Sequence, residues 1–180
     1  MGVVAVVLAA GSSSRLGRPK QTLLYEGETL LDRAVRIARE AAGDVIVVER
    51  GAGVPPARGT PALLVHNANP DEGIASSIRT GVAAAGADAR ILFTLCDQPR
   101  VTAEHLRALI AIDAPIVATG YSGIAGVPAI FAPRFVPELL ALRGDRGARA
   151  IIERHRDEVH VIAFEDAAID IDDARDVQKL

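Results

Sequence analysis

Short segments made almost entirely of apolar residues recur along the chain, and longer segments of mixed character separate them. The first is Val3–Leu8, which no polar residue interrupts. A strand whose side chains are apolar on both sides is buried on both faces, as strands are in a mostly parallel sheet covered by helices. Further strands are expected on the same ground at residues 45–48, 62–65, 91–95, 116–118 and 159–163.

The segments between these runs have helical periodicity. It is clearest at residues 29–41, where Leu30, Leu31, Ala34 and Val35 recur at the spacing of one helix face. Further helices are expected at residues 75–85, 103–112, 135–142, 148–155 and 173–180. The alternation predicts an α/β protein with one domain over residues 1–180. The expected architecture is a Rossmann-like three-layer sandwich with a mostly parallel sheet.

Composition and charge argue against several classes of protein. The 180 residues are 49% apolar and carry a formal charge of −3, with no basic run. This argues against nucleic acid as a partner. The first apolar segment is too short for a membrane span and has no cationic flank, so neither a signal peptide nor a membrane anchor is expected. A single cysteine excludes an internal disulfide and is typical of a cytoplasmic protein.

A loop of small residues follows the first strand directly. Residues 9–14 read Ala-Ala-Gly-Ser-Ser-Ser, and the cations Arg15 and Lys20 come next. Small residues let backbone N–H groups approach a phosphate, and the two cations can neutralise its charge. The spacing between Gly11 and Gly17 is one residue too long for a P-loop, and the dinucleotide fingerprint fails at its second glycine. The loop therefore predicts a different kind of nucleoside triphosphate site.

A carboxylate, Asp97, follows the apolar segment at residues 91–95. This places it at the carboxyl end of a strand, where open α/β sheets bind ligands. One or two carboxylates, completed by phosphate and water, are what Mg²⁺ requires. A cap of the turn before Thr102 explains the same position equally well, so from the residues alone both interpretations stay open.

Six motifs, in this order, resemble the MobA-like NTP transferase family, in particular the branch that contains the molybdenum cofactor cytidylyltransferases. The first runs from Leu8 to Lys20 and is similar to the family signature L-A-[AG]-G-x-S-x-R-[ML]-G-x-x-K. The other motifs lie at residues 69–78, 95–99, 126–131, 144–149 and 170–176. The resemblance covers nearly the whole chain and implies a fold like that of nucleotide-diphospho-sugar transferases.

The resemblance also implies an activity. A nucleoside monophosphate would pass from a triphosphate to the phosphate of molybdopterin, with Mg²⁺ as cofactor and pyrophosphate as the second product. The second alanine in Leu8-Ala9-Ala10-Gly11 favours CTP, while GTP remains the alternative. A molybdenum hydroxylase would be the protein partner that receives the product.

Site residues follow by position in the motifs. The triphosphate would be bound by Arg15 and Lys20 and by the loop residues Leu8, Ala9, Ala10, Gly11, Ser12 and Ser13. Mg²⁺ would be held by Asp97 and Asp172, with Asp170 as second choice for the latter. Gly73 and Ser77 would contact the base or ribose, and Gly126, Pro128, Asp145 and Arg149 would lie on the acceptor side, with Asp145 also capping a helix.

Two other classes of function stay open. One is an accessory protein that binds nucleotide or cofactor for a molybdenum enzyme without turnover. The other is a dinucleotide-dependent oxidoreductase, which the broken fingerprint disfavours. The four histidines lack zinc spacing, and Cys96 is expected to be a buried small side chain rather than a nucleophile.

Overall fold

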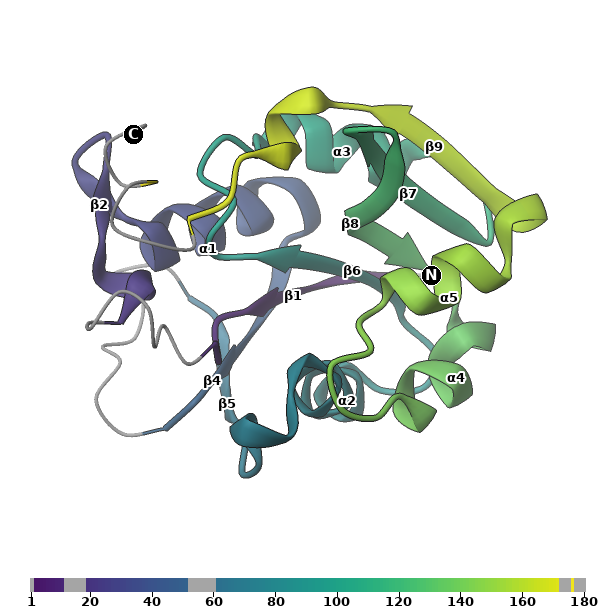
Figure 1. Cartoon of the computed structure of the whole chain (residues 1–180), viewed down its shortest axis with the longest axis horizontal. Coiled ribbons are helices and arrows are strands. Elements are labelled where there is room, and N and C mark those ends of the chain that lie inside the picture. Colours follow the sequence, from purple (N-terminus) through teal and green to yellow (C-terminus); the bar gives the residue numbers. More distant parts are fainter. Residues whose placement is uncertain (1, 12–18, 52–60, 172–175, 177–180) are drawn as a thin grey trace.

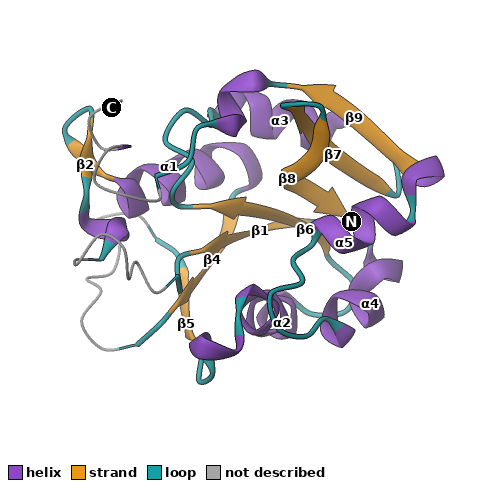
Figure 2. Ribbon diagram, viewed as in Figure 1, coloured by secondary structure: helices purple, strands orange, loops and turns teal. Residues whose placement is uncertain are grey.

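A seven-stranded sheet forms the centre of the computed structural model, which describes residues 2–11, 19–51, 61–171 and 176 (Figures 1 and 2). Its strand order is β5-β4-β1-β6-β8-β7-β9. The strands are β1 (Val3–Leu8), β4 (Asp44–Glu49), β5 (Leu63–His66), β6 (Arg90–Leu95), β7 (Ile116–Tyr121), β8 (Ile124–Phe131) and β9 (Val159–Ala163). Only β8 runs antiparallel to its neighbours, so the prediction of a mostly parallel sheet is confirmed.

Helices cover both faces of this sheet. The described α-helices are α1 (Leu30–Ala42), α2 (Ile74–Ala85), α3 (Ala103–Ala111), α4 (Val136–Ala141) and α5 (Arg149–Arg154). Along β1, Ala5 and Val7 pack with α1 and α3, whereas Val6 and Leu8 pack with α2, α4 and α5. The strands β1, β4, β6, β7 and β8 thus bury alternate side chains in two separate cores. Figure 1 shows the helices on the two faces of the sheet. The three-layer sandwich predicted from the continuous apolar runs is confirmed.

The register of the central strands brings three loops to one edge of the sheet. Leu8, the last residue of β1, pairs with Val48 of β4 on one side and with Leu95 of β6 on the other. The backbone of Ala9 continues the pairing by donating to the Val48 carbonyl at 2.9 Å. The chain segments that follow these three strands therefore emerge next to one another, which is where an open α/β sheet binds its ligands.

Strand β8 was not among the expected strands, and the reason lies in Pro128. A proline lacks the N–H that a ladder needs, so its presence argues against a strand interior. In the structure the β7–β8 register shifts at this point, with Ala118 opposite Ala129 but Thr119 opposite Gly126. The intervening Val127 and Pro128, joined by a cis peptide bond, form a bulge that needs no ladder donor.

Two further differences from the predicted elements concern the segment before α1 and the end of the chain. A short hairpin, β2 (Leu24–Tyr25) with β3 (Glu28–Thr29), precedes α1 and was not expected. The helix expected at residues 173–180 lies outside the described residues except at position 176. Within the described part of the chain, no helix is long and apolar enough to cross a membrane.

Candidate active site

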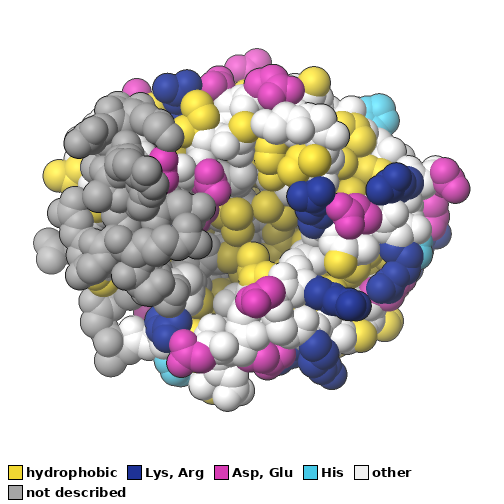
Figure 3. All heavy atoms as spheres, in the orientation of Figure 1, with side chains coloured by type: hydrophobic (Ala, Val, Ile, Leu, Met, Phe, Trp, Pro, Cys, Tyr) yellow, Lys and Arg dark blue, Asp and Glu magenta, His cyan; other side chains and the backbone are white. Residues whose placement is uncertain are grey.

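A cavity of about 370 Å³ opens at the carboxyl edge of β1, β4 and β6. Figure 3 shows it as a hollow with hydrophobic side chains on its floor. Its walls come from the segments after the three strands, from the start of α2 and from the loop before α5. Of the predicted site residues, the cavity is lined by Leu8, Ala10, Gly11, Lys20, Gly73, Ser77, Asp97 and Asp145. Four separate motifs of the sequence therefore converge on one cavity.

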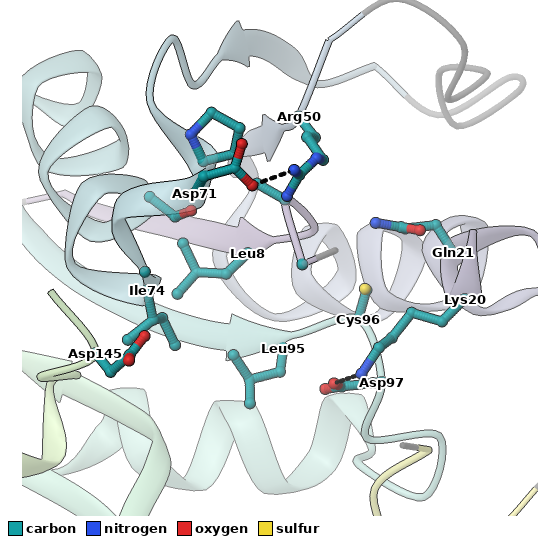
Figure 4. Close-up of a pocket in the computed structure, with 15 residues that line it drawn as sticks. Leu8, Lys20, Gln21, Arg50, Asp71, Ile74, Leu95, Cys96, Asp97 and Asp145 are labelled. Atoms are coloured by element: carbon teal, nitrogen blue, oxygen red, sulfur yellow. Dashed lines mark hydrogen bonds and ion pairs between the residues drawn. The ribbon is translucent and has the colours of Figure 1, made fainter. Parts of the chain in front are cut away.

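At one end of the cavity, Lys20 and Asp97 form an ion pair with 2.7 Å between Nζ and Oδ2 (Figure 4). Their side chains are only 12% and 18% exposed. Lys20 opens the 3₁₀ turn Lys20–Thr22, and in that turn the Gln21 side chain donates to the carbonyl of Ala9. The hydrogen bond from Gln21 holds this turn against the loop after β1. Lys20 therefore lies beside Asp97, just after the end of β6.

Asp97 does not cap the helix that follows it. Helix α3 is capped by the Thr102 hydroxyl, which accepts from the His105 amide. The second carboxylate oxygen of Asp97, Oδ1, is buried in the cavity wall and has no hydrogen-bond partner among the described residues. An unpartnered carboxylate oxygen of this kind fits a divalent cation that takes its other ligands from phosphate and water.

The acidic motif at residues 170–176 contacts Asp97 through a backbone hydrogen bond. Ile171 is fully buried, and its amide donates to the Asp97 carbonyl at 3.0 Å. Asp170 precedes this contact within the described residues, whereas Asp172 lies outside them. Arg15, Ser12 and Ser13 also lie outside the described residues.

Gly73 joins two of the predicted motifs. It precedes α2 with φ +113°, and a Cβ built on it would lie 2.4 Å from Asp145 Oδ1 and 2.5 Å from the Gly144 carbonyl oxygen. The Ala75 amide also donates to that carbonyl, at 3.1 Å. Only a glycine allows this approach. Asp145 therefore lines the cavity beside α2, and the prediction that it caps α5 is wrong, because Ala148 occupies that cap position.

Asn67, which the sequence analysis did not single out, organises the start of α2. Its side chain is buried, donates from Nδ2 to Ser77 Oγ at 3.0 Å, and accepts at Oδ1 from the Ser76 hydroxyl and the Asn69 amide. The backbone donor at Asn69 fixes which end of the amide is the oxygen. A polar residue two positions after the run at 62–65 was the available signal, and Asp97 lies two positions after its own run at 91–95.

A second missed residue is Arg50, which lines the cavity after β4. Its guanidinium forms an ion pair with Asp71, on a side of the cavity away from Lys20 and Asp97 (Figure 4). No pattern marked this arginine, because it is one of eighteen in the chain and is followed by a Gly- and Pro-rich stretch.

Three predicted acceptor-side residues do not line this cavity. Gly126 lies against Tyr121, whose hydroxyl oxygen would be 2.6 Å from an added Cβ, and the Pro128 carbonyl accepts from the Thr119 hydroxyl. Arg149 is paired with Glu153 at 2.8 Å and lines a second cavity of about 320 Å³ next to the β7–β8 turn. Ala9 is buried behind the first cavity, with its carbonyl bound to Gln21.

Cys96 lines the cavity but is not poised as a nucleophile. Burial, and next the charge of Asp97, raise the pKa of its thiol far above the ordinary value. Each unit by which the pKa rises lowers the thiolate fraction about tenfold at a given pH. We therefore expect the folded protein to react with a disulfide reagent at pH 8 roughly 100-fold more slowly than the urea-unfolded chain. Absorbance of the thiolate released from the reagent measures this, and equal rates would show that folding does not suppress ionisation of the Cys96 thiol.

Comparison with known proteins gives the family. Residues 5–159 match the MobA-like NTP transferase domain. The chain is 33% identical over 168 residues to the purine catabolism protein PucB of Bacillus subtilis, covering 84% of this chain and 80% of that protein. It is 30% identical over 167 residues to nicotine blue oxidoreductase of Paenarthrobacter nicotinovorans, with 84% and 82% covered. A shorter match, 46% over 50 residues, is to a "Probable molybdenum cofactor guanylyltransferase" of Opitutus terrae, covering 28% of this chain and 25% of that protein.

Solved structures of the same fold also match the chain. Rv0371c of Mycobacterium tuberculosis superimposes with a TM-score of 0.83 at 30% identity, covering 99% of this chain and 97% of that one. The same protein in complex with manganese superimposes with a TM-score of 0.79 at 28% identity, covering 100% and 98%. The chain belongs to the MobA-like NTP transferase family.

Proposed function

We propose that this protein transfers CMP from CTP to the phosphate of a molybdopterin-type acceptor and releases pyrophosphate. The observation that carries the proposal is the Lys20–Asp97 pair in the cavity next to the small-residue loop, with Asp97 Oδ1 left without a protein partner among the described residues. A cation donor and a cation-binding carboxylate side by side are what a triphosphate bound to a divalent metal requires.

The chemistry needs alignment more than proton transfer. An acceptor phosphate oxygen forms a bond to the α-phosphorus of the nucleotide, and the bond from that phosphorus to the β-phosphate bridging oxygen breaks. A phosphate is already largely ionised near neutral pH, so no protein base has to remove a proton. Catalysis then rests on holding the two substrates in line and neutralising the charge that develops.

Each group of residues has one part in this proposal. Lys20, with Arg15, donates to the triphosphate, and the loop from Leu8 to Ser13 surrounds it with backbone N–H groups. Asp97 and Asp172 would hold Mg²⁺, which supplies positive charge to the phosphates when bound. The complex of Rv0371c with manganese supports a divalent cation in this fold.

The nucleoside would lie against the start of α2. Because Asn67 donates to Ser77 Oγ, the Ser77 hydroxyl proton is left to donate into the cavity. Gly73 provides the close backbone approach beside it. On the acceptor side, Asp145 faces the same cavity, and Arg149 lines the second cavity beside the β7–β8 turn. The resemblance places Gly126 and Pro128 on this side as well, and both are buried.

Two alternatives have specific support. GTP in place of CTP is favoured by the short match to a guanylyltransferase, whose name also supports a molybdenum-related acceptor. A molybdenum hydroxylase as recipient of the product remains part of the proposal. An oxidoreductase is favoured by the relative named for that activity, 30% identical over 167 residues. An accessory protein that binds nucleotide without turnover would keep the cavity and lack the reaction.

One experiment separates these functions. Pyrophosphate release is measured from CTP and from GTP, with Mg²⁺ and a molybdopterin-type acceptor, and NADH and NADPH oxidation is measured in parallel. We expect acceptor-dependent release from CTP. Release of pyrophosphate from GTP alone would identify GTP as the substrate and would support the same type of reaction. Nucleotide binding without pyrophosphate release would identify an accessory protein. Oxidation of a reduced dinucleotide without pyrophosphate release would overturn the proposal.

A further inference from the structure

The Gln98 side chain is buried where three segments of the chain meet. It is 7% exposed, and its Nε2 donates to the Ala167 carbonyl at 2.9 Å and to the Val127 carbonyl at 3.3 Å. Ala167 belongs to the 3₁₀ turn Glu165–Ala168, and Val127 belongs to the bulge of β8. One amide group therefore ties the end of β6 to two segments that come later in the chain.

A second contact acts on the same segment. The amide of Ile171 donates to the Asp97 carbonyl at 3.0 Å, and the Ile171 side chain packs in a small core with Leu23 and Leu30. Consecutive residues, Asp97 and Gln98, thus hold positions 171 and 167 of the closing segment. Between these two anchors lies Asp170, and directly after them in the sequence comes Asp172.

The role of Gln98 is that of a donor. Its Oε1 is buried and has no hydrogen-bond partner among the described residues, so only the N–H groups of the amide are used. A carboxylate here would face two carbonyl oxygens, and an apolar side chain would leave both carbonyls without this donor.

We propose that Gln98 is a positioning residue: by holding the turn at Ala167 it fixes the segment up to Ile171 against Asp97, and so sets the divalent cation affinity of the nucleotide site. This inference rests on the proposed function, because it assumes that a cation binds at Asp97. Gln98 itself does not touch the cation in this scheme. It acts through the closing segment, as residues that orient metal ligands do.

The test replaces Gln98 by methionine, which keeps the length of the side chain and removes the donor. Mn²⁺ binding is measured by electron paramagnetic resonance with a non-hydrolysable CTP analogue present. Exchange of the Ile171 amide hydrogen is measured by NMR without nucleotide or metal. We expect the Mn²⁺ dissociation constant to rise about tenfold and the Ile171 amide to exchange at least roughly tenfold faster.

A matched control separates this tether from general loosening of β8. Thr119 is fully buried, donates to the Pro128 carbonyl and is hydrogen-bonded to His105 Nε2, so Thr119→Val loosens the same bulge while both anchors of the closing segment, at positions 167 and 171, are kept. We expect its Mn²⁺ affinity and its Ile171 exchange to stay within about twofold of the wild type, because neither anchor of the segment is lost. Equal losses in Thr119→Val and Gln98→Met would overturn the assignment to Gln98.

The remaining outcomes are also decisive. A folded Gln98→Met that binds Mn²⁺ and protects the Ile171 amide as the wild type does would overturn the inference. If that variant does not fold, Gln98→Asn, which keeps the amide on a shorter chain, replaces it with the same expected direction. A wild-type protein that binds no Mn²⁺ would remove the proposed metal function, whereas the exchange of the Ile171 amide would still decide whether Gln98 holds the segment.

Discussion

Replacing Asp97 by asparagine is expected to lower kcat/KM for pyrophosphate release by about 10³-fold, which corresponds to about 4 kcal/mol of transition-state stabilisation. The amide keeps the size of the side chain but lacks the charge, so it binds a divalent cation weakly and no longer pairs with Lys20. Because Lys20 is only 12% exposed, loss of this ion pair would weaken the stabilisation of a largely buried cation. We therefore also expect a loss of about 1–3 kcal/mol in the free energy of unfolding of the nucleotide-free protein.

Steady-state kinetics with CTP and acceptor, together with urea unfolding, separate the two effects. Asp113→Asn is the matched control, because Asp113 is exposed and lies before β7, away from the cavity. It should change kcat/KM by less than about twofold and stability by less than about 0.5 kcal/mol. An Asp97→Asn variant that is destabilised but keeps its activity would mean that the Lys20–Asp97 pair is purely structural.

The layer structure could be read from the sequence because both faces of the sheet are covered. A strand such as β1 contributes alternate side chains to two cores, so every position along it is apolar and the run is easily recognised. Strand β8 could not be found in this way. Its Pro128 and Gly126 suit a bulge that only the pairing with β7 creates, and no local pattern specifies that pairing.

In the candidate site too, residues marked by a local sequence pattern could be predicted, whereas those whose role depends on tertiary contacts could not. Lys20 and Asp97 are 77 positions apart in the sequence. Both could be assigned to one nucleotide site because each comes after a buried strand and each belongs to a motif that resembles the same family. Asn67 also follows a strand, but its function depends on Ser76 and Ser77, which reach it only when α2 packs beside β5. The contact of Gly73 with Gly144 also depends on tertiary packing. Each of the two motifs could be recognised in the sequence, but their contact could not be predicted from it.

Replacing Gly73 by alanine is expected to cost about 3 kcal/mol of folding free energy and to raise the dissociation constant for CTP about tenfold. The added methyl would lie 2.4 Å from Asp145 Oδ1 and 2.5 Å from the Gly144 carbonyl oxygen, and a backbone carbonyl cannot turn away as a flexible side chain can. The loop before α5 must then move off α2, and it takes with it the wall of the cavity that Asp145 forms. Urea unfolding and calorimetric titration with CTP measure the two losses.

Gly86 provides the control for backbone strain, since it ends α2 as Gly73 begins it. Its φ and ψ are 86° and 166°, against 113° and −176° at Gly73, so both residues occupy a region that only glycine adopts easily. A Cβ at Gly86, however, would meet nothing within 4 Å. Gly86→Ala should therefore cost about 1–2 kcal/mol and leave CTP affinity unchanged, so the difference between the two variants measures the contact between the motifs. Equal costs in both, with CTP affinity unchanged in both, would show that Gly73 serves only the turn and that the Asp145 wall of the cavity does not depend on it.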